Sequence, residues 1–423
     1  MSSLGARDPG GGGLRAEVVG VGTEILLGQI ANTNAQHISQ ALADIGVHVY
    51  YHCAVGDNLD RVVSLLEVAA ARSDVVLITG GLGPTPDDLT REAVATWLGR
   101  PLVRDERLCE VITQIFASLG RPMPAHNLRQ ADLPEGAMPI DPVGTAPGFI
   151  VDDGPAGVAA LPGVPWEMKA MLESAVLPWL RSKVGEAVIL SRHVIVLGLG
   201  ESLTHSKIAD IVEAQTNPTI AYLAGGGFVR VRLTAKAAAV ADAEALIAPV
   251  EAAIRARLGD TALPGSGGSL AEAVGEMLVA RGVTVAAAES LTGGLIGAML
   301  TSAPGASDFF LGSLVCYSTD AKRRVAGIDE AVVSGPGVVS EEAARALAEA
   351  AAARFAADLG IAATGVAGPD AQEGQAPGTV YVAATFRGRT EARRIKGFGD
   401  RSHVRAQAVT AALDLGRVLV SRG

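Results

Sequence analysis

A serine ahead of two glycines is the part of this sequence whose residue types point most directly to chemistry. An apolar run ends in Ser290, and Thr292, Gly293 and Gly294 follow before the next apolar stretch begins. The pattern predicts a strand that leads into a helix, with glycines that allow a ligand to approach the backbone. Ser290 is then a candidate nucleophile, and N–H groups around 292–294 are candidates for stabilising an oxyanion. In the alternative interpretation, Ser290 only caps the helix.

A nucleophilic serine needs a base, and a lysine downstream could serve as one. Tyr317 and Lys322 lie five positions apart, and a serine paired with a lysine makes a hydrolase that needs no histidine. Burial or neighbouring cations would lower the pKa of Lys322, so that its amine could accept a proton. In the alternative interpretation, Tyr317 is an ordinary core residue and Lys322 a solvated surface residue.

A second candidate site is the segment TGGLGPTPDD at 79–88, which follows an apolar run. Its glycines suit a close approach of the backbone to phosphate groups. These glycines are Gly80, Gly81 and Gly83. Asp87 and Asp88 follow and could hold a divalent metal beside phosphate oxygens. Alternatively, the two acids only offset the dipole at a helix N-terminus.

An earlier strand-end loop supplies further polar residues. Glu24, Asn32 and Asn34 could contact a ribose or a metal-bound water, or they could cap the helix that follows. In open α/β sheets ligands bind beyond the carboxyl ends of the strands. The segment 20–24 should therefore meet the glycine segment 79–88 in one crevice.

Short apolar runs that alternate with longer helical stretches predict the elements that position both sites. This alternation indicates an α/β domain with a parallel sheet at 15–182. A small α+β module is predicted at 190–260, a linker at 261–269 and a second α/β domain at 270–423. Residues 1–14 are small, polar and glycine-rich, which predicts a disordered tail.

Proline and turn residues are frequent between 121 and 148, which predicts irregular loops over the first site. Turns of small residues occur at 144–148, with Gly144 and Thr145, and again at 161–168. Either turn could be a plain connection between strands or part of the site.

Composition limits the class of protein. The 423 residues are enough for roughly two to four domains, and 49% of them are hydrophobic. A net charge of −10 argues against a general nucleic-acid binder. The three cysteines are too far apart for a disulfide framework or a CxxC metal site. Because no apolar leader or membrane-length run is visible, we expect a cytoplasmic protein that does not enter a membrane.

Four motifs near the N-terminus resemble, in order, the molybdopterin-binding-like domain that opens proteins of the CinA family. They are GTEILLG at 22–28, TGGLGPTPDD at 79–88, GTAPG at 144–148 and LPGVPWEM at 161–168. GLGES at 198–202 and NPTIA at 217–221 resemble the family's KH-like middle module. The sequence from Ala288 resembles its nicotinamide-nucleotide amidase domain.

The resemblance implies two hydrolytic activities in pyridine-nucleotide metabolism. The family's C-terminal domain converts nicotinamide mononucleotide to nicotinic acid mononucleotide and ammonia, and no cofactor is expected there. Its N-terminal domain splits ADP-ribose into AMP and ribose 5-phosphate, and could accept NAD-like dinucleotides. That domain is metal-dependent, with Mg²⁺, Mn²⁺ or Co²⁺ expected and a monovalent cation as a further candidate. The family and general base rates also lead us to expect a homodimer.

The family's catalytic residues fall on Ser290, Tyr317, Lys322 and Thr364 of this chain. The resemblance implies that Lys322 takes the proton of Ser290, and that Tyr317 relays a proton to the departing ammonia. Thr364, which Gly365 follows, would orient the amide or the serine.

The resemblance also implies a phosphate clamp in the turn at 398–405, where Arg401 and Arg405 are both candidates.

Two departures from the family pattern stand out. Leu291 replaces the usual cysteine, so thiol chemistry is not available there. The segment 370–376 is acidic where the family commonly has a glycine pair and a lysine, which predicts weaker phosphate affinity.

Other functional classes remain open. The same N-terminal fold binds molybdopterin without hydrolysing it, so this domain could be a nucleotide-binding or pterin-binding module. The family also has an old association with DNA uptake. RNA binding by the middle module is not expected, because the glycine run at 224–228 has no basic neighbour before Arg230.

Overall fold

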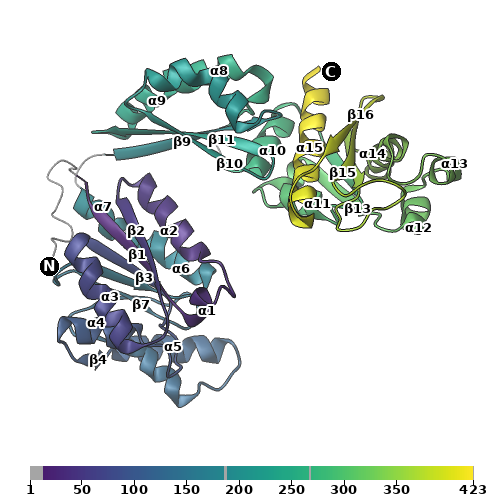
Figure 1. Cartoon of the computed structure of the whole chain (residues 1–423). Coiled ribbons are helices and arrows are strands. Elements are labelled where there is room, and N and C mark those ends of the chain that lie inside the picture. Colours follow the sequence, from purple (N-terminus) through teal and green to yellow (C-terminus); the bar gives the residue numbers. More distant parts are fainter. Residues whose placement is uncertain (1–12, 185–187, 266–267, 423) are drawn as a thin grey trace. The chain divides into compact units, whose positions relative to one another are not determined.

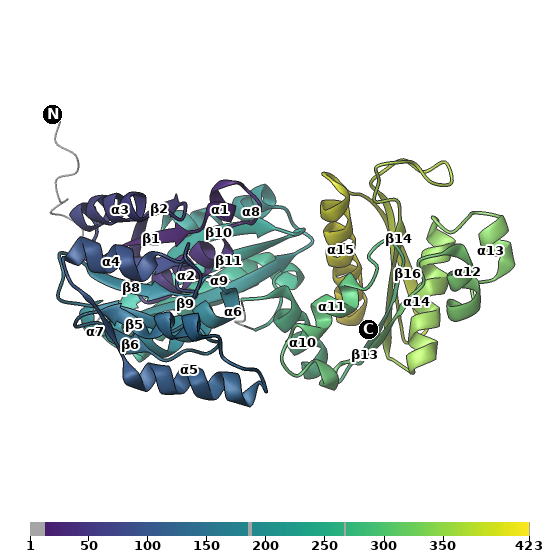
Figure 2. The same cartoon turned by 90° about the horizontal axis from the view of Figure 1, so that it is seen from below.

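The computed structural model describes residues 13–184, 188–265 and 268–422. They form two compact units, shown in Figure 1 and Figure 2. One unit contains the chain up to residue 190 and a short later segment, 236–243; the other contains the rest. Of the predicted tail at 1–14, all but the last two residues lie outside the described ranges, as do residues 266 and 267 of the predicted linker.

The N-terminal domain is built on a six-stranded sheet in the order β2-β1-β3-β8-β7-β6. The strands are β1 (Arg15–Val21), β2 (His48–Val55), β3 (Val75–Thr79), β6 (Met138–Ile140), β7 (Gly148–Val151) and β8 (Gly157–Leu161). β1 is parallel to β2 and β3, and β3 is parallel to β8, as predicted. β7 and β6 extend the edge in antiparallel orientation. The connection from β7 to β8 covers only residues 152–156, too short for the crossover that a parallel pair requires.

Helices cover both faces of this sheet. They are α1 (Thr23–Leu26), α2 (Thr33–Asp44), α3 (Leu59–Arg72), α4 (Thr90–Leu98), α5 (Glu106–Ser118), α6 (Pro165–Met171) and α7 (Leu177–Val184). Buried apolar residues of α3, α4 and α5 form the core on one face, and those of α2, α6 and α7 form the core on the other. Asn32 caps α2 by accepting from the Ala35 N–H, which fixes where the chain turns from the strand-end loop into the helix.

The prediction of irregular loops at 121–148 is wrong in part. This stretch contains the 3₁₀ helix η1 (Ala125–Ala131), the strand β5 (Asp132–Pro134) and the strand β6. β5 pairs antiparallel with β4 (Leu102–Arg104), and the Arg104 Nε donates to the Asp132 carboxylate at 2.7 Å. Such short strands are difficult to predict in a proline-rich segment, because three residues are too few to show the alternation of apolar and polar side chains.

The middle module is a three-stranded sheet in the order β10-β11-β9, with two helices. Its elements are β9 (Val188–Leu197), α8 (Glu201–Glu213), β10 (Thr219–Gly225), β11 (Phe228–Ala237) and α9 (Val240–Leu258). The glycine run at 224–228 is the turn of the antiparallel β10–β11 hairpin. It therefore does not form the helix-to-helix loop that grips a nucleic-acid backbone in RNA-binding KH modules.

The C-terminal domain has a five-stranded mixed sheet in the order β13-β12-β14-β15-β16. The strands are β12 (Val285–Glu289), β13 (Phe310–Val315), β14 (Leu359–Gly365), β15 (Thr379–Phe386) and β16 (Arg389–Lys396). Its helices are α10 (Leu270–Ala280), α11 (Leu295–Thr301), α12 (Thr319–Ala321), α13 (Glu330–Ser334), α14 (Glu341–Phe355) and α15 (Arg401–Arg422). α10, α11 and α15 pack on one face, and α14 on the other. In the described part of the chain, no helix combines the length and apolar character that a membrane span requires.

Candidate active sites

The C-terminal domain has a pocket of about 310 Å³ at the carboxyl ends of β12 and β14. Segments far apart in the sequence meet there. The predicted site residues that line it are Ser290, Tyr317, Lys322, Gly365 and Arg401. A small neutral or anionic ligand held here would face a hydroxyl, an amine and a guanidinium together.

Ser290 directly follows β12, and only 6% of its surface is exposed. Its N–H donates to the Ala363 carbonyl at 3.0 Å, which ties it to the neighbouring strand β14. Helix α11 begins later, and its N-cap is Gly294, with no side-chain cap. The interpretation of Ser290 as the cap of α11 is therefore wrong, and Ser290 instead lines the pocket.

The cap of α11 is instead the carboxylate of Glu289, which is fully buried. It accepts hydrogen bonds from the N–H groups of Gly294 at 2.8 Å, Ile296 at 3.0 Å and Gly297 at 2.9 Å. The Ser313 hydroxyl donates to it at 2.7 Å. The Glu289 side chain thus already accepts from the backbone N–H groups at the start of α11, where an anionic ligand would otherwise bind.

This arrangement corrects the oxyanion donors predicted at 292–294. The Gly294 N–H is used by Glu289, and the Gly293 N–H donates to the Ser290 carbonyl at 3.1 Å. Thr292 is buried completely. A backbone N–H that is already bonded cannot stabilise a developing charge, so Gly293 and Gly294 are not available in the predicted role.

Lys322 is buried, with 2% of its surface exposed, and its Nζ donates to the Tyr317 carbonyl at 3.1 Å. Burial lowers the pKa of its amine, against the smaller opposing influences of Cys316 and Glu373. Lys322 is therefore not a solvated surface residue. Tyr317 is not a core residue either, because 60% of its surface is exposed.

Thr364 is fully buried beneath the pocket and does not line it. Its hydroxyl donates at 2.7 Å to the carbonyl of Val338, which does line the pocket. Gly365 follows and forms part of the wall; a Cβ there would lie 2.8 Å from the Val380 Cα. Thr364 thus holds a wall segment in place instead of facing the ligand.

The two candidate arginines have different partners, although both lie in the first turns of α15. Arg401 lines the pocket and donates to the Tyr317 hydroxyl at 3.1 Å and to the Gly368 carbonyl at 2.7 Å. Arg405 instead donates to the carbonyls of Leu291 at 2.9 Å and Thr292 at 2.7 Å. The geometry makes Arg401 the candidate ligand contact and Arg405 a brace for the loop after Ser290.

The N-terminal domain has a larger pocket, of about 530 Å³, where the segments 20–24 and 79–88 meet as predicted. Most of the residues predicted for this site line it: Glu24, Asn32, Asn34, Gly80, Gly81, Gly83, Asp87, Asp88 and Thr145. Gly144 does not line it. A Cβ at 144 would collide with the Glu167 carboxylate, so this glycine makes room for a pocket-lining side chain.

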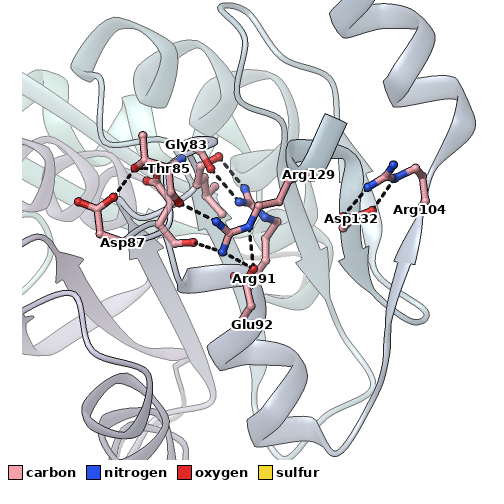
Figure 3. A network of polar contacts seen from close by, with 10 residues as sticks. Gly83, Thr85, Asp87, Arg91, Glu92, Arg104, Arg129 and Asp132 are labelled. Carbon is pink, nitrogen blue, oxygen red and sulfur yellow. Dashed lines mark hydrogen bonds and ion pairs between the residues drawn. The ribbon is translucent and has the colours of Figure 1, made fainter. Parts of the chain in front are cut away.

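Figure 3 shows how the end of the glycine segment is held. The Thr85 hydroxyl donates to the carboxylates of Asp87 and Asp88, and the Thr85 N–H donates to Asp88 Oδ2 at 2.9 Å. The bond from Thr85 lowers the pKa of Asp87. Arg129 donates to the Thr85 carbonyl at 2.8 Å and the Glu92 carboxylate at 2.8 Å. The contacts with Thr85 thus hold the two aspartates side by side.

Arg91 also holds the glycine segment in place, and the sequence analysis did not predict this role. Its guanidinium is fully buried and donates to the carbonyls of Leu82 at 2.6 Å and Gly83 at 2.8 Å. Burial lowers the pKa of Arg91. An arginine in a helical stretch has no spacing signal that would reveal such a role, since solvated arginines are common there.

Gln130 and Glu167 also line the N-terminal pocket and were missed. Gln130 is 1% exposed, and Glu167 is 8% exposed. Burial raises the pKa of Glu167. The LPGVPWEM motif contained the signal for Glu167, because it places an acid in the first turn of a helix that follows a strand end.

Comparison with known proteins identifies the family of this chain. Residues 17–182 match the family described as a probable molybdopterin binding domain, 191–262 the damage-inducible protein CinA KH domain, and 268–419 the CinA C-terminal domain. A CinA-like protein of Frankia casuarinae is 43% identical over 418 residues, which cover 96% of this chain and 96% of that protein. The chain belongs to the CinA family.

Further CinA relatives cover nearly the whole chain or part of it. The CinA-like protein of Dictyoglomus thermophilum is 41% identical over 403 residues, covering 95% of this chain and 98% of that protein. A crystal structure titled as the protein CinA with unknown function from Thermoplasma acidophilum is 40% identical, with a TM-score of 0.36. It covers 38% of this chain and 95% of that chain.

Proposed function

We propose that the C-terminal domain hydrolyses the carboxamide of nicotinamide mononucleotide, giving nicotinic acid mononucleotide and ammonia. The observation that carries the proposal is the buried Lys322 amine on the wall of the pocket that Ser290 also lines. A lysine acts as a base in its neutral form, and burial lowers the pKa of Lys322, which favours that form.

In this mechanism the Ser290 Oγ attacks the carboxamide carbon while its proton passes to the Lys322 Nζ. The tetrahedral intermediate expels ammonia, which takes a proton from the Lys322 ammonium, and an acyl-serine remains. Water then attacks the acyl carbon while Lys322 accepts its proton, and Lys322 returns this proton to the Ser290 Oγ as nicotinic acid mononucleotide leaves. The Tyr317 hydroxyl accepts from Arg401, so its own hydrogen can form a hydrogen bond with the departing nitrogen while Lys322 supplies the proton. Arg401 also binds the substrate phosphate.

Ammonia release from nicotinamide mononucleotide by the full chain tests this assignment. Ser290→Ala should reduce turnover by about three orders of magnitude or more. Ser302→Ala is a matched control, because this serine is exposed and donates only to the Met299 carbonyl within its own helix. Wild-type turnover in Ser290→Ala would exclude the serine as nucleophile.

For the N-terminal domain we propose metal-dependent cleavage of the diphosphate of ADP-ribose. The favouring observation is the set of five carboxylates on the pocket wall beside the glycine segment, with no Lys, Arg or His among the described lining residues. A diphosphate in such a pocket needs a cation to offset its charge. The carboxylates are Glu24, Asp57, Asp87, Asp88 and Glu167.

Asp87 and Asp88 would hold the metal, which neutralises the diphosphate and polarises the phosphoryl group when bound. Among the described residues, no three His, Cys, Asp or Glu side chains are grouped so that they could hold one metal ion together. That fits a small divalent ion that keeps its waters and takes one or two carboxylates plus substrate phosphates. The Gly80 N–H already donates to the Leu161 carbonyl at 3.0 Å, so Gly81 and Gly83 are the candidate phosphate donors.

AMP formation from ADP-ribose by the full chain, assayed with Mg²⁺, Mn²⁺ and Co²⁺ in turn, tests this second activity. Activity with at least one metal that disappears on adding a chelator is expected. Lack of AMP with every metal would favour a binding module without catalysis. Retention of DNA or RNA in a gel shift at physiological salt would instead favour a nucleic-acid role.

A further inference from the structure

Glu167 differs from the other carboxylates that line the N-terminal pocket. It lies in the first turn of α6, and only 8% of its surface is exposed. In the described part of the chain, its carboxylate takes part in no hydrogen bond and no ion pair. Asp87 and Asp88, by contrast, both accept from the Thr85 hydroxyl. A buried acid without a partner is uncommon, because its charge loses hydration and gains nothing in return.

Two motifs that the sequence analysis singled out combine to place this carboxylate at the pocket. The turn at 161–168 leads from β8 into α6 and contains Glu167 itself. The turn at 144–148 begins with Gly144, where a Cβ would collide with the Glu167 Oε1. Neither oxygen of Glu167 is sealed off, in contrast to the partnerless amide oxygens of Asn34 and Gln130. Since Glu167 lines the pocket, its carboxylate can contact a water or a ligand there.

No charged neighbour compensates for the burial of Glu167. Lys169 and Glu173 follow it on the same helical stretch, and His37 lies on α2, which shares an apolar core with α6. None of these groups shifts the pKa of Glu167, and no other pocket carboxylate does; burial alone raises it. A raised pKa makes the ionised form a stronger base than an exposed glutamate.

Glu167 and the proposed metal ligands belong to different ends of the glycine segment. The turn that leads into α6 adjoins the start of the segment, where the Gly80 N–H donates to the Leu161 carbonyl at 3.0 Å. The Asp88 carboxylate lies against Gly83, three residues further along. A diphosphate bound along the segment would therefore have the two aspartates towards one end and an unpaired carboxylate towards the other.

We propose that Glu167 is the general base of the N-terminal reaction, and that its carboxylate takes a proton from the water that attacks the diphosphate. The water oxygen bonds to one phosphorus while the bond from that phosphorus to the bridging oxygen breaks. The bridging oxygen leaves with the electron pair as part of the second phosphate, and Glu167 later releases its proton to solvent. Water is a weak nucleophile and needs this help, whereas a phosphate leaves readily as an anion. The inference rests on the proposed hydrolysis and adds the residue that activates the water.

AMP formation from ADP-ribose by the full chain, with the divalent metal that supports the highest rate, tests the proposal. Glu167→Gln keeps the size of the side chain and removes the base, so kcat should fall about 100-fold or more while KM changes little. Wild-type kcat should rise with pH through the pKa of Glu167 and then level off, because the ionised carboxylate is the active form. The residual activity of the variant should lack this rise. Glu110→Gln is the matched control, since Glu110 is exposed on α5 away from the pocket.

Two further measurements separate catalysis from a structural role. Because burial disfavours the ionised form, Glu167 destabilises the folded chain above its raised pKa, so Glu167→Gln should unfold at the same or a higher temperature than the wild type at pH 8. The uncleavable analogue α,β-methylene ADP-ribose should bind the variant with Mg²⁺ at least as tightly as the wild type in calorimetry. Gly144→Ala, which displaces the carboxylate, should lower kcat in the wild type but cause little further loss in Glu167→Gln.

The outcomes distinguish this proposal from the hydrolysis on which it rests. Undiminished kcat in Glu167→Gln, or a pH profile that the substitution leaves unchanged, would overturn the assignment of the base and leave the hydrolysis standing. Analogue binding that weakens as much as kcat falls would also overturn it, because Glu167 would then be a ligand contact. Lack of AMP from the wild type with every metal would overturn the hydrolysis and the general base together.

Discussion

Arg401 donates a hydrogen bond to the Tyr317 hydroxyl at 3.1 Å, across 84 positions of sequence. The pair joins the first turn of α15 to the segment that also contains Lys322. Because an arginine only donates, the tyrosine must accept from it and keeps its own hydrogen for a ligand. The contact therefore sets the direction in which Tyr317 can pass a proton.

Arg401→Met should raise the KM for nicotinamide mononucleotide about tenfold while kcat changes less, because a charged bond to the substrate phosphate is lost. Steady-state ammonia release measures both constants. Arg389→Met is a suitable control, since this arginine is exposed on β16 and pairs with Glu391. An unchanged KM would show that Arg401 serves Tyr317 alone.

The pH dependence of kcat follows from the state of Lys322. In the proposed mechanism its neutral amine is the base, and burial places its pKa below the ordinary value of 10.5. Turnover should therefore rise with pH through that lowered pKa and level off above it. Lys322→Arg cannot lose its proton in this range and should be inactive throughout. A rate that falls as pH rises from neutral would contradict the assignment.

The same burial has a consequence for stability. The unfolded chain binds a proton at Lys322 more readily than the folded chain does, because the pKa is lower in the folded state. The contribution of Lys322 to the free energy of unfolding is therefore least favourable below the folded pKa. It rises with pH from there up to the unfolded pKa of about 10.5. Lys322→Met should thus increase the free energy of unfolding at pH 7 and abolish ammonia release. Urea denaturation measures the first effect; a lower midpoint would indicate that Lys322 is stabilising.

Residues that line the two pockets could be predicted from the sequence more readily than the residues that support them. Ser290 and the glycine segment follow strand ends, and strand ends at glycines can be read from apolar runs. Glu289 could not be read in the same way, because its role depends on α11 folding back over it. Nor could sequence choose between Arg401 and Arg405, which lie one helical turn apart on the same helix. The two arginines differ only in the hydrogen-bond partners that the fold brings to each side chain.

The N-terminal activity should depend on Asp88. Asp88→Asn keeps the shape of the side chain but removes the charge that would bind the metal, so metal-dependent AMP formation should fall by about two orders of magnitude, or about 3 kcal/mol of transition-state stabilisation. Ammonia release should be unchanged. Asp153→Asn provides a matched control outside the pocket, where the carboxylate pairs with Arg100. Full AMP formation in Asp88→Asn would place the metal elsewhere.

Glu289 offers the most direct test of how Ser290, the proposed nucleophile, is positioned. Its two carboxylate oxygens accept three backbone N–H groups and the Ser313 hydroxyl. Glu289→Gln replaces one oxygen with a donor that faces other donors, which should lower the free energy of unfolding by about 1–3 kcal/mol. Because Ser290 is the next residue, kcat for ammonia release should fall about tenfold or more, with little change in KM. Glu289→Asp, which keeps the charge on a shorter side chain, should recover part of both losses. A variant that loses stability but keeps kcat would show that Glu289 anchors α11 without positioning Ser290.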